Sequence, residues 1–280
     1  MNMKILKRTL IFMLCLFLTA ALLAGYAFKI EPFMVFTHYY DLNAPDRKIT
    51  QVIRVVQLSD IQVNASYTEN KLEELVDKVN DLSPDVIVFT GDLFDNFSKY
   101  KAVDAVTSAL SALNASYGKY AVWGNRDYGG GASRVYADIM SNSGFTLLKN
   151  EGITVTTTKG HELFIGGLDD ALLGFPDIST TLRYMEDDPD YRIILLHEPD
   201  IADRFEAGSA NLLLAGHSHG GQVKLPFIKS PVTSLAEKYT SGFYDIDNNM
   251  KLYVNTGIGT SHIPARFMVP PEIAVFNIGL

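Results

Sequence analysis

Five short apolar runs, each followed by a polar group, constrain the fold of this 280-residue chain more than any other feature of its sequence. The runs are rich in Val, Ile, Leu and aromatic residues, and they cover positions 52–58, 86–89, 120–123, 193–196 and 212–215. Runs of this length, bounded by polar residues, predict buried β-strands. In open α/β sheets the ligand-binding crevice lies beyond the carboxyl ends of the strands, where distant parts of the chain converge. We therefore expect an α/β fold with one such crevice.

The polar segments after these runs carry Asp, Asn and His side chains. They read Leu-Ser-Asp-Ile-Gln at 58–62, Thr-Gly-Asp-Leu-Phe-Asp at 90–95, Trp-Gly-Asn-Arg-Asp at 123–127, Leu-His-Glu at 196–198 and Gly-His-Ser-His-Gly at 216–220. Carboxylate and imidazole groups suit divalent ions such as Mn, Fe and Zn. Taken alone, Asp60 or Asp92 is equally a cap of the following loop or helix, and His197 is more readily a buried core histidine. Their order at five strand ends favours a shared metal site.

Between the runs the sequence alternates helix with strand. Ser66-x-x-Glu69 resembles a capping box, and apolar residues follow at helical spacing until Ser83-Pro84 ends the segment. A second helix is predicted over 103–113, which implies parallel strands joined by right-handed crossovers. Short β-prone segments then predict a second sheet packed on the first, with helices outside both; they cover 153–158, 161–166, 242–246, 250–255 and 272–278. Because no repeat or linker divides this part of the sequence, we expect one domain over 51–280.

The N-terminus has the pattern of a membrane anchor. Basic residues lie within positions 1–8, and the apolar run at 9–28 carries no charge. About 20 residues of helix match the hydrocarbon thickness of a bilayer. The sequence therefore predicts a single-pass cell-membrane helix over 9–28 and a connector over 29–50, with the domain outside the cytoplasm because the positive charges stay inside. Removal of the segment as a secretory signal, at Gly25-Tyr26-Ala27, stays open.

Charge and cysteine content exclude several classes of function. The formal net charge of −8 disfavours nucleic acid as the main partner, since such partners select basic surfaces. Cys15 is the only cysteine and lies in the apolar run. The domain therefore has no disulfide, no thiolate zinc site and no thiol nucleophile.

The ordered set Asp-x-x, Gly-Asp-x-x-Asp, Gly-Asn-Arg-Asp, His and Gly-His-Ser-His resembles that of the calcineurin-like metallophosphoesterases. The segments Val-Asn-Thr-Gly-Ile-Gly at 254–259 and Pro-Ala-Arg-Phe at 264–267 resemble the membrane-anchored bacterial phosphodiesterase branch of that family. The resemblance implies a four-layer αββα sandwich of two mixed β-sheets flanked by helices. It also implies a phosphoesterase that cleaves phosphodiester or pyrophosphate bonds by attack of a hydroxide bridging two divalent ions.

The resemblance assigns roles to individual residues. It places Asp60, Asp92 and His219 on one metal and Asp92, Asn125, His197 and His217 on the other, so that Asp92 bridges. Asn125, Arg126 and Asp127 form the expected catalytic segment, in which Arg126 neutralises the phosphoryl oxygens. Asp95, Gln222, His262 and Arg266 are expected behind the ligands or against the substrate. For His262 and Arg266, a packing or salt-bridge role stays open.

Gln62 is a departure, because the family usually has His in an Asp-x-His motif at this position. A Gln carbonyl oxygen can coordinate a metal, but it is a weaker ligand for borderline ions and has no acid/base function. Several consequences stay open. The metal site that holds Asp60 is weak, prefers a harder ion, or is occupied only when substrate is bound. If the usual His acts on the leaving group instead, the substrate has a good leaving group, as a pyrophosphate does. A degenerate member that binds metal or ligand without turnover is the alternative.

The expected substrate is a phosphoester, lipid-linked if the tether keeps the site near the bilayer. The apolar stretch at 223–244, which includes Leu225, Phe227, Ile228, Pro231 and Leu235, predicts an apolar wall beside the metals; packing of the second sheet explains it equally well. Gly-Asn-Arg-Asp is also similar to the motif of UDP-2,3-diacylglucosamine pyrophosphatases, which is a second reading of the substrate. Those enzymes act in the cytoplasm and carry a helical lid that is not evident here. We expect a monomer.

Overall fold

The computed structural model describes residues 3–45, 48–186, 188–227 and 233–280. The helices are α1 (Met3–Lys29), α2 (Glu69–Asp81), α3 (Val103–Ser111), α4 (Asn125–Tyr128), α5 (Tyr136–Asn142) and α6 (Ile178–Leu182), and the 3₁₀ turns are η1 (Glu31–Phe33), η2 (Ala132–Arg134), η3 (Pro199–Arg204) and η4 (His219–Gly221). The strands are β1 (Phe36–Asn43), β2 (Val52–Leu58), β3 (Val86–Phe89), β4 (Lys119–Ala121), β5 (Phe145–Leu147), β6 (Glu151–Thr156), β7 (Glu162–Gly167), β8 (Tyr191–Leu195), β9 (Leu212–Ala215), β10 (Gly242–Asp245), β11 (Lys251–Val254) and β12 (Glu272–Gly279).

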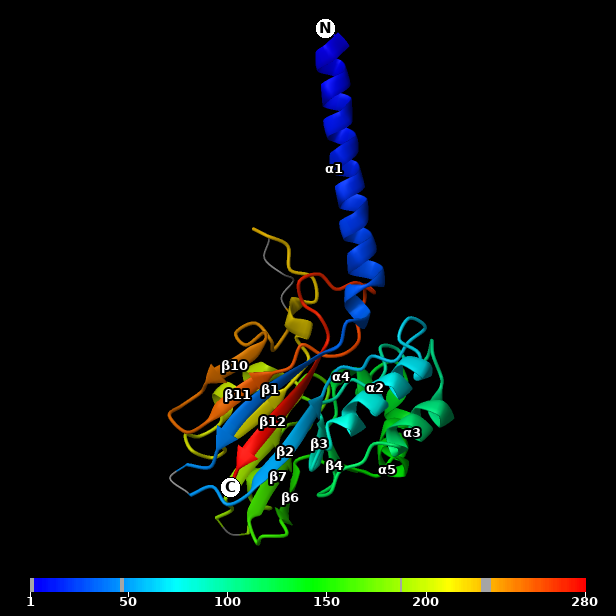
Figure 1. The fold of residues 1–280 in the computed structure, drawn as a ribbon. Helices are drawn as coiled ribbons and strands as arrows, with labels where there is room; N and C mark the ends of the chain where they lie inside the picture. The colour runs from blue at the N-terminus through cyan, green and yellow to red at the C-terminus, as the bar shows by residue number, and fades with distance from the viewer. Residues whose placement is uncertain (1–2, 46–47, 187, 228–232) are drawn as a thin grey trace.

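The described strands form two mixed sheets of six (Figure 1). The first has the order β1-β12-β2-β3-β4-β5, and the second has the order β10-β11-β9-β8-β7-β6. Strands β2 to β5 run parallel to one another, as do β7, β8, β9 and β11. β12 runs antiparallel to β2 and β1 runs parallel to β12, so both begin at the end where β2 finishes.

Three apolar layers hold the sheets and helices together. Because side chains alternate across a strand, Val56 and Leu58 of β2 pack against helices, whereas Ile53 and Val55 pack against the second sheet. Helices α2, α3 and α5 cover the outer face of the first sheet, and α6 with η3 covers that of the second. Figure 1 shows the three longer helices gathered on one side of the domain. The predicted four-layer αββα sandwich is confirmed.

The start of α2 corrects one prediction. The helix begins at Glu69, but the Ser66-x-x-Glu69 capping box does not form. Asn64 Oδ1 instead accepts the backbone N–H groups of Ser66 at 2.7 Å and Tyr67 at 3.0 Å. The Glu69 carboxylate accepts a hydrogen bond from the Tyr100 hydroxyl. The N-cap of the helix is Thr68, so Ser66 and Glu69 do not occupy the two positions of a capping box.

Residues 36–43 of the predicted connector form β1, an edge strand of the first sheet. β1 pairs with β12 along its whole length, from Phe36 opposite Glu272 to Asn43 opposite Gly279. Its side chains are only half-buried at best, so no apolar run marks it in the sequence. The domain therefore includes a strand within 29–50.

Helix α1 leaves the domain as a single long rod (Figure 1). Its 27 residues span about 40 Å, more than the hydrocarbon core of a bilayer. The apolar segment has a mean hydropathy of 2.3 and is only 6% buried, unlike the core helix of a globular domain. The helix is therefore long and apolar enough to cross a membrane.

Candidate metal centre

The strand-end loops of each sheet lie side by side. Past β2 and β3, Asp60 N donates to Gly91 O at 2.9 Å, which sets Asp60 beside Asp92. Past β8 and β9, Gly216 N donates to His197 O at 3.1 Å. The sheets are joined here by buried Gln57, whose amide donates to Thr90 Oγ1 of the first sheet at 3.1 Å and to Ala215 O of the second at 2.9 Å. The strand ends of both sheets thus face one another.

Two carboxylates and three imidazoles meet between these loops. His197 Nε2 lies 3.4 Å from Asp92 Oδ1, and His217 Nδ1 lies 3.2 Å from His197 Nε2. His219 Nε2 lies 3.3 Å from Asp60 Oδ1. Two ligand atoms held at about 2.1 Å from one ion are about 3.0–3.4 Å apart in octahedral or tetrahedral geometry. All five side chains are buried, so their spacing and enclosure suit metal ligation.

Backbone carbonyls fix which ring nitrogen carries the proton in two of these histidines. A carbonyl oxygen only accepts, so His197 Nδ1 donates to Thr90 O at 2.6 Å and His217 Nε2 donates to Ser234 O at 2.9 Å. The remaining nitrogens, His197 Nε2 and His217 Nδ1, then direct lone pairs at each other across 3.2 Å. Two lone pairs repel at that distance unless a cation lies between them. The pair is therefore built around a metal ion or a shared proton.

Further site atoms are buried without a hydrogen-bond partner. Within the described parts of the chain these include Asp60 Oδ1, Gln62 Oε1 and His219 Nδ1. Leaving such an atom unsatisfied in a protein interior costs about 1–3 kcal/mol. Divalent ions would satisfy the carboxylate and amide oxygens, because both are metal ligands. The donor set therefore fits the divalent metals that the sequence predicts.

Burial and mutual proximity set the charges in the centre. Burial disfavours the charged form of His197, but the Asp92 and Asp60 carboxylates raise its pKa well above the usual value. Burial and the neighbouring His197 lower the pKa of His217, and burial lowers the pKa of His219 to about 4. Burial opposes ionisation of Asp92, yet the adjacent imidazoles hold its pKa below the usual value. The ionised Asp92 carboxylate and the neutral His217 and His219 imidazoles are thus in the state in which such groups bind metals, whereas His197 releases a proton when a metal binds.

The ligand loops hold a backbone conformation that favours glycine. Positive φ angles occur at Asp60 (47°), Asp92 (64°), His217 (68°) and His219 (48°). Each such residue costs on the order of 1–3 kcal/mol and persists only where its surroundings enforce it. Four of them within one cluster indicate that the loops are shaped for the site and not for stability.

Two glycines allow these loops to approach. A Cβ atom on Gly216 would lie 1.9 Å from Ser59 Oγ and 2.4 Å from Asp60 Oδ2. A Cβ atom on Gly124 would lie 2.4 Å from Asp92 Oδ1 and 2.9 Å from His197 Cε1. Any larger residue at either position would displace a ligand.

A cavity of about 410 Å³ opens beside the cluster, and Asn125 and Arg126 line it together with Asp92, His217 and His219. Asn125 is the first residue of α4, which places its amide at the cavity wall. The predicted ligands Asp60, Asp92, Asn125, His197, His217 and His219 are thus brought to one place.

The Arg126 side chain is held at the cavity by three neighbours. Its guanidinium lies 3.4 Å from Asp95 Oδ1 and donates to Ser261 Oγ at 2.6 Å and to His262 Nε2 at 2.9 Å. Because a guanidinium only donates, His262 Nε2 is the acceptor in this hydrogen bond. Asp95 and His262 therefore orient the cation that faces the cavity.

Asp127 lies behind the ligands and does not face the cavity. Its carboxylate accepts the N–H groups of Asp92 at 2.8 Å, Leu93 at 2.9 Å and Gly124 at 2.9 Å. Burial and the nearby Asp92 raise the pKa of Asp127 to about 8 against these three donors. Asp127 thus positions the Asp92 loop and does not act on a substrate.

Gln222 and Arg266 also have structural contacts. The Gln222 amide donates to Ile263 O at 2.7 Å and accepts from Ser261 N at 2.8 Å, so it fixes the loop that carries His262. Arg266 is fully buried, and burial lowers its pKa to about 10. Its guanidinium makes five hydrogen bonds to the backbone carbonyls of Thr256, Gly257, Gly259 and Val269. Of the two readings left open for Arg266, the structure supports packing.

Gln62 lies within the ligand cluster. Its amide nitrogen donates to Asp92 Oδ2 at 2.8 Å, and its Oε1 atom is one of the unpartnered buried atoms. The carboxylate can only accept, which fixes the orientation of the amide. Gln62 therefore orients the predicted bridging carboxylate and leaves one oxygen free to bind.

Sequence reasoning missed a buried carboxyl pair behind His197. Glu198 and Asp170 are each at most 1% exposed, and Glu198 Oε2 accepts the N–H of Ala171 at 2.9 Å. Burial and hydrogen bonding to Asp170 raise the pKa of Glu198 well above its usual value. Glu198 also lies within ligand distance of His197 and His217. A signal was available, because β7 ends in Gly-Gly-Leu-Asp-Asp at 166–170, an apolar strand followed by carboxylates like the other five.

The apolar stretch after the Gly-His-Ser-His loop divides between the cavity and the core. Val223 lines the cavity, whereas Leu235 packs with the outer core of the second sheet. Leu225 and Phe227 are exposed. Ile228 and Pro231 lie outside the described residues.

Comparisons with known proteins agree with this geometry. The model of the calcineurin-like phosphoesterase family matches residues 53–221. The protein named uncharacterized metallophosphoesterase YkuE, of Bacillus subtilis (strain 168), is 38% identical over 258 residues, which cover 91% of this chain and 89% of that protein. UDP-2,3-diacylglucosamine pyrophosphatase LpxG of Chlamydia muridarum is 27% identical over 283 residues, with 80% and 83% covered. A transmembrane protein with metallophosphoesterase domain from Danio rerio is 28% identical over 247 residues, which cover 83% of this chain and 55% of that protein.

Proposed function

This chain belongs to the calcineurin-like phosphoesterase family, and from that premise we propose that it is a membrane-anchored enzyme that hydrolyses phosphodiester or pyrophosphate bonds with two divalent metals. The observation that carries the proposal is the pair of ring nitrogens His197 Nε2 and His217 Nδ1, which face each other across 3.2 Å beside Asp92. Backbone carbonyls occupy the other nitrogen of each ring, so these two nitrogens are left to share a metal ion, or a proton when no metal is bound.

The residues divide between two ions as the family resemblance implies. Asp60, Asp92 and His219 would hold one ion, with the free Gln62 oxygen as a further ligand. Asp92, Asn125, His197 and His217 would hold the other. When bound, divalent ions of the Mn, Fe or Zn type polarise phosphoryl oxygens as Lewis acids and lower the pKa of water.

The chain's own groups bind and orient the phosphoryl group. Arg126 presents a permanent positive charge at the cavity wall, where it would neutralise the phosphoryl oxygens as negative charge builds on them. Asp95 and Ser261 hold that guanidinium in place. His262 accepts a hydrogen bond from Arg126 and lies at the exposed rim of the cavity, where it would contact the leaving group of the substrate.

Gln62 bears on which bonds are cleaved. Its amide does not ionise near neutral pH, so it cannot give up a proton to a leaving oxygen. A site without an imidazole at this position favours leaving groups that depart as stable anions, such as phosphates. Pyrophosphate bonds of the kind named for the Chlamydia muridarum relative meet this condition, and they support a lipid-linked nucleoside or sugar pyrophosphate as substrate.

Anchoring by α1 is the second part of the proposal. It is supported by the length and exposure of the helix and by the similarity to the Danio rerio protein, which is described as a transmembrane protein. The basic residues 1–8 favour a cytoplasmic N-terminus and a domain outside the cytoplasm. We further propose that the chain acts as a monomer. Its net charge of −8 argues against nucleic acid as the main substrate.

The test uses full-length protein in detergent, supplied in turn with Mn²⁺, Fe²⁺ and Zn²⁺. Hydrolysis of bis-p-nitrophenyl phosphate and of nucleotide pyrophosphates is measured alongside bound metal. We expect activity that falls at least about 100-fold in Asp92→Asn and His217→Ala, because each removes a metal ligand. Asp245→Asn, on an exposed strand end away from the cluster, serves as the matched control.

Two outcomes would contradict the proposal in different ways. Folded protein that binds two metals but hydrolyses none of the substrates would support the degenerate, non-catalytic alternative. If the folded protein binds no more metal than the His217→Ala variant does, the proposed metal site itself is wrong. Protease access to the domain in sealed membrane vesicles of known orientation shows on which side of the membrane the domain lies. A cytoplasmic domain would favour the UDP-2,3-diacylglucosamine pyrophosphatase-like function.

A further inference from the structure

The end of α1 is fastened to a loop of the domain. Ala27 O, in the last turn of α1, accepts the backbone N–H of Arg266 at 2.9 Å. The Tyr26 ring packs edge-on against Phe267, with 6.4 Å between ring centroids. Glu31, just after the helix, accepts the N–H of Val269 at 2.7 Å. The direction of α1 relative to the domain is therefore set by contacts and not by a free linker.

The same loop reaches the metal centre. The buried Arg266 side chain donates to Gly259 O, and Gly259 N donates to Asp60 O at 2.8 Å. Three hydrogen-bond steps thus lead from the end of α1 to a predicted metal ligand. β1 begins beside the start of β12, and β12 begins where β2 ends, so the topology also places α1 at the site-bearing end. Figure 1 shows α1 leaving from this end.

Exposed apolar side chains surround the base of α1. They come from the segment directly after the helix and from the loops at 223–227 and 261–268, which are joined by a hydrogen bond from Lys224 N to Phe267 O of 2.9 Å. We call them the collar; its members are Ile30, Phe33, Met34, Phe36, Leu225, Phe227, Ile263 and Met268. Their exposure ranges from 38% at Met34 to full exposure at Phe227. Clustered exposure of large apolar groups marks an interaction surface.

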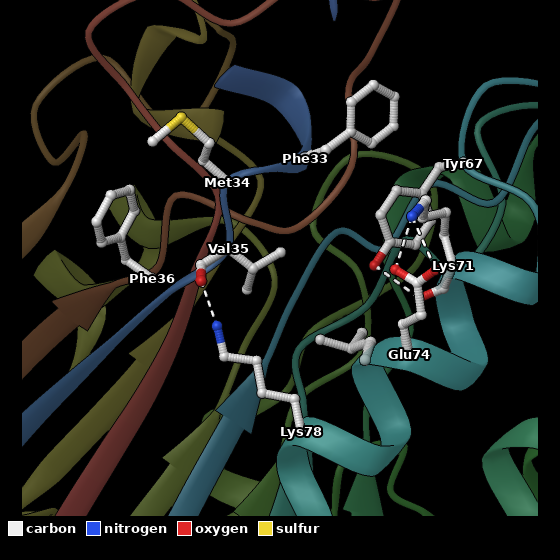
Figure 2. Close-up of a pocket in the computed structure, with 9 residues that line it drawn as sticks. Phe33, Met34, Val35, Phe36, Tyr67, Lys71, Glu74 and Lys78 are labelled. Carbon is white, nitrogen blue, oxygen red and sulfur yellow. Dashed lines mark hydrogen bonds and ion pairs between the residues drawn. The ribbon is translucent and has the colours of Figure 1, made fainter. Parts of the chain in front are cut away.

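A groove of about 380 Å³ beside the collar is lined by Lys71, Glu74 and Lys78. Lys71 is ion-paired with Glu74 at 2.6 Å, so Lys78 supplies the net positive charge of the groove. Figure 2 shows Met34 and Phe36 on the side of this groove opposite Lys71 and Glu74, with the Lys78 ammonium directed at the Val35 carbonyl. Lysines next to exposed aromatic and aliphatic groups are typical of surfaces that rest at the headgroup level of a bilayer.

The height of the collar matches that of the bilayer surface. Tyr26 precedes Lys29, the last residue of α1, by three positions, which is about 4.5 Å along the helix toward the membrane. Phe267 contacts Tyr26, so the loop beside it reaches the level of the last helical turn. A bilayer crossed by α1 would therefore meet the collar directly.

We propose that the collar docks on the lipid bilayer and holds the mouth of the metal-site cavity against the membrane surface. The inference rests on the anchoring proposed above. Ile263 belongs both to the collar and to the cavity wall, so the path from cavity to membrane is apolar on at least one side. The substrate that this geometry takes is an amphiphile whose phosphoester lies near the headgroup plane while its acyl chains stay in the bilayer.

The test places a fluorescent probe on the full-length chain in vesicles of phosphatidylcholine and phosphatidylglycerol. Because Cys15 is the only cysteine, Cys15→Ser gives a background for single-cysteine variants. The collar sites are Phe36→Cys and Met268→Cys, and the control is Ile153→Cys, an exposed apolar residue on edge strand β6. Each cysteine carries an environment-sensitive nitrobenzoxadiazole label, and spin-labelled lipids serve as quenchers.

We expect quenching at positions 36 and 268 at least about twofold stronger than at 153, with emission shifted to shorter wavelength. Equal quenching at all three positions would overturn the proposal. Emission that changes with protein density at fixed lipid, without lipid quenching, would also overturn it and indicate contact between copies of the chain. These readouts do not depend on hydrolysis, so their failure is distinct from failure of the proposed enzyme activity.

A second measurement links docking to substrate. Met268 has φ of 58°, a conformation that Asn accepts more readily than Met, so Met268→Asn should fold. We expect this variant to hydrolyse soluble bis-p-nitrophenyl phosphate at an unchanged rate, while its rate of hydrolysis of a phosphoester lipid in vesicles falls at least about fivefold. An equal effect on both substrates, or on neither, would contradict the docking role.

Discussion

Replacing Gly124 by Ala should empty the metal centre without unfolding the domain. The backbone at Gly124 has φ of −110° and ψ of 169°, which Ala adopts freely, so backbone strain does not enter. The added Cβ atom would lie 2.4 Å from Asp92 Oδ1, whereas real contacts of this kind are no closer than 3.0 Å. The carboxylate must therefore retreat by about 0.6 Å. Metal sites tolerate errors of only about 0.2 Å in their ligand distances.

The same crowding sets the expected cost in stability. Overpacking a well-filled site destabilises the folded state by about 1–3 kcal/mol. Replacing Gly by Ala also reduces the conformational entropy of the unfolded chain, which stabilises the folded state by about 0.4–1 kcal/mol. We expect Gly124→Ala to lower the free energy of unfolding by about 1–2 kcal/mol in urea titrations and to reduce bound metal to below half by elemental analysis. Gly129→Ala is the matched control, because its Cβ atom would meet nothing closer than Asn125 O at 3.2 Å. Full metal content and activity in Gly124→Ala would refute the assigned position of Asp92.

Three further predictions follow from single residues. In the metal-free protein, His219 takes up its proton near pH 6.5 when unfolded but only at about pH 4 when folded. The free energy of unfolding should therefore fall by about 3 kcal/mol as pH falls from about 6.5 to 4, and urea titrations of His219→Ala should lack this component. Arg266→Met removes five hydrogen bonds to four backbone carbonyls, of which Gly257 O keeps the Glu272 N–H at 3.2 Å. It should lower the free energy of unfolding by about 3–5 kcal/mol in urea titrations, against little change in exposed Arg134→Met. Gln62→His should raise metal content and broad phosphoesterase activity together; no change in either would place Gln62 outside the coordination sphere.

The ligand cluster could be predicted because strand direction does most of the positioning. The apolar residues of β3 end at Phe89, with only Thr90 before Gly91-Asp92, and those of β9 end directly before Gly216-His217. The sequence alone therefore indicates at which end of these strands the groups lie. Parallel neighbours then share that edge. Five strand ends with metal-binding side chains leave little freedom in where they meet.

Roles that depend on contacts across the fold could not be predicted. Arg266 and Arg126 are both arginines beside glycine-rich or polar turns, yet one is enclosed by backbone carbonyls and the other faces a cavity. Nothing local separates them, because most of the carbonyls around Arg266 come from residues 256–259, a segment held by hydrogen bonds to Ser59 O and Asp60 O far earlier in the chain. The protonated nitrogen of His217 likewise depends on Ser234 O, a backbone atom far along the chain.

The position of the anchor shows the same limit at the level of topology. A helix before the first strand leaves from whichever end that strand begins, and β1 carries no apolar run from which its pairing could be read. Pairing parallel to β12 puts its start at Phe36 opposite Glu272, beside the end of β2. Had β1 instead paired antiparallel to β12, its eight residues would have carried the start about 25 Å away, at the opposite end of the sheet. One strand direction therefore decides whether α1 leaves the domain from the end that carries the metal centre or from the opposite end.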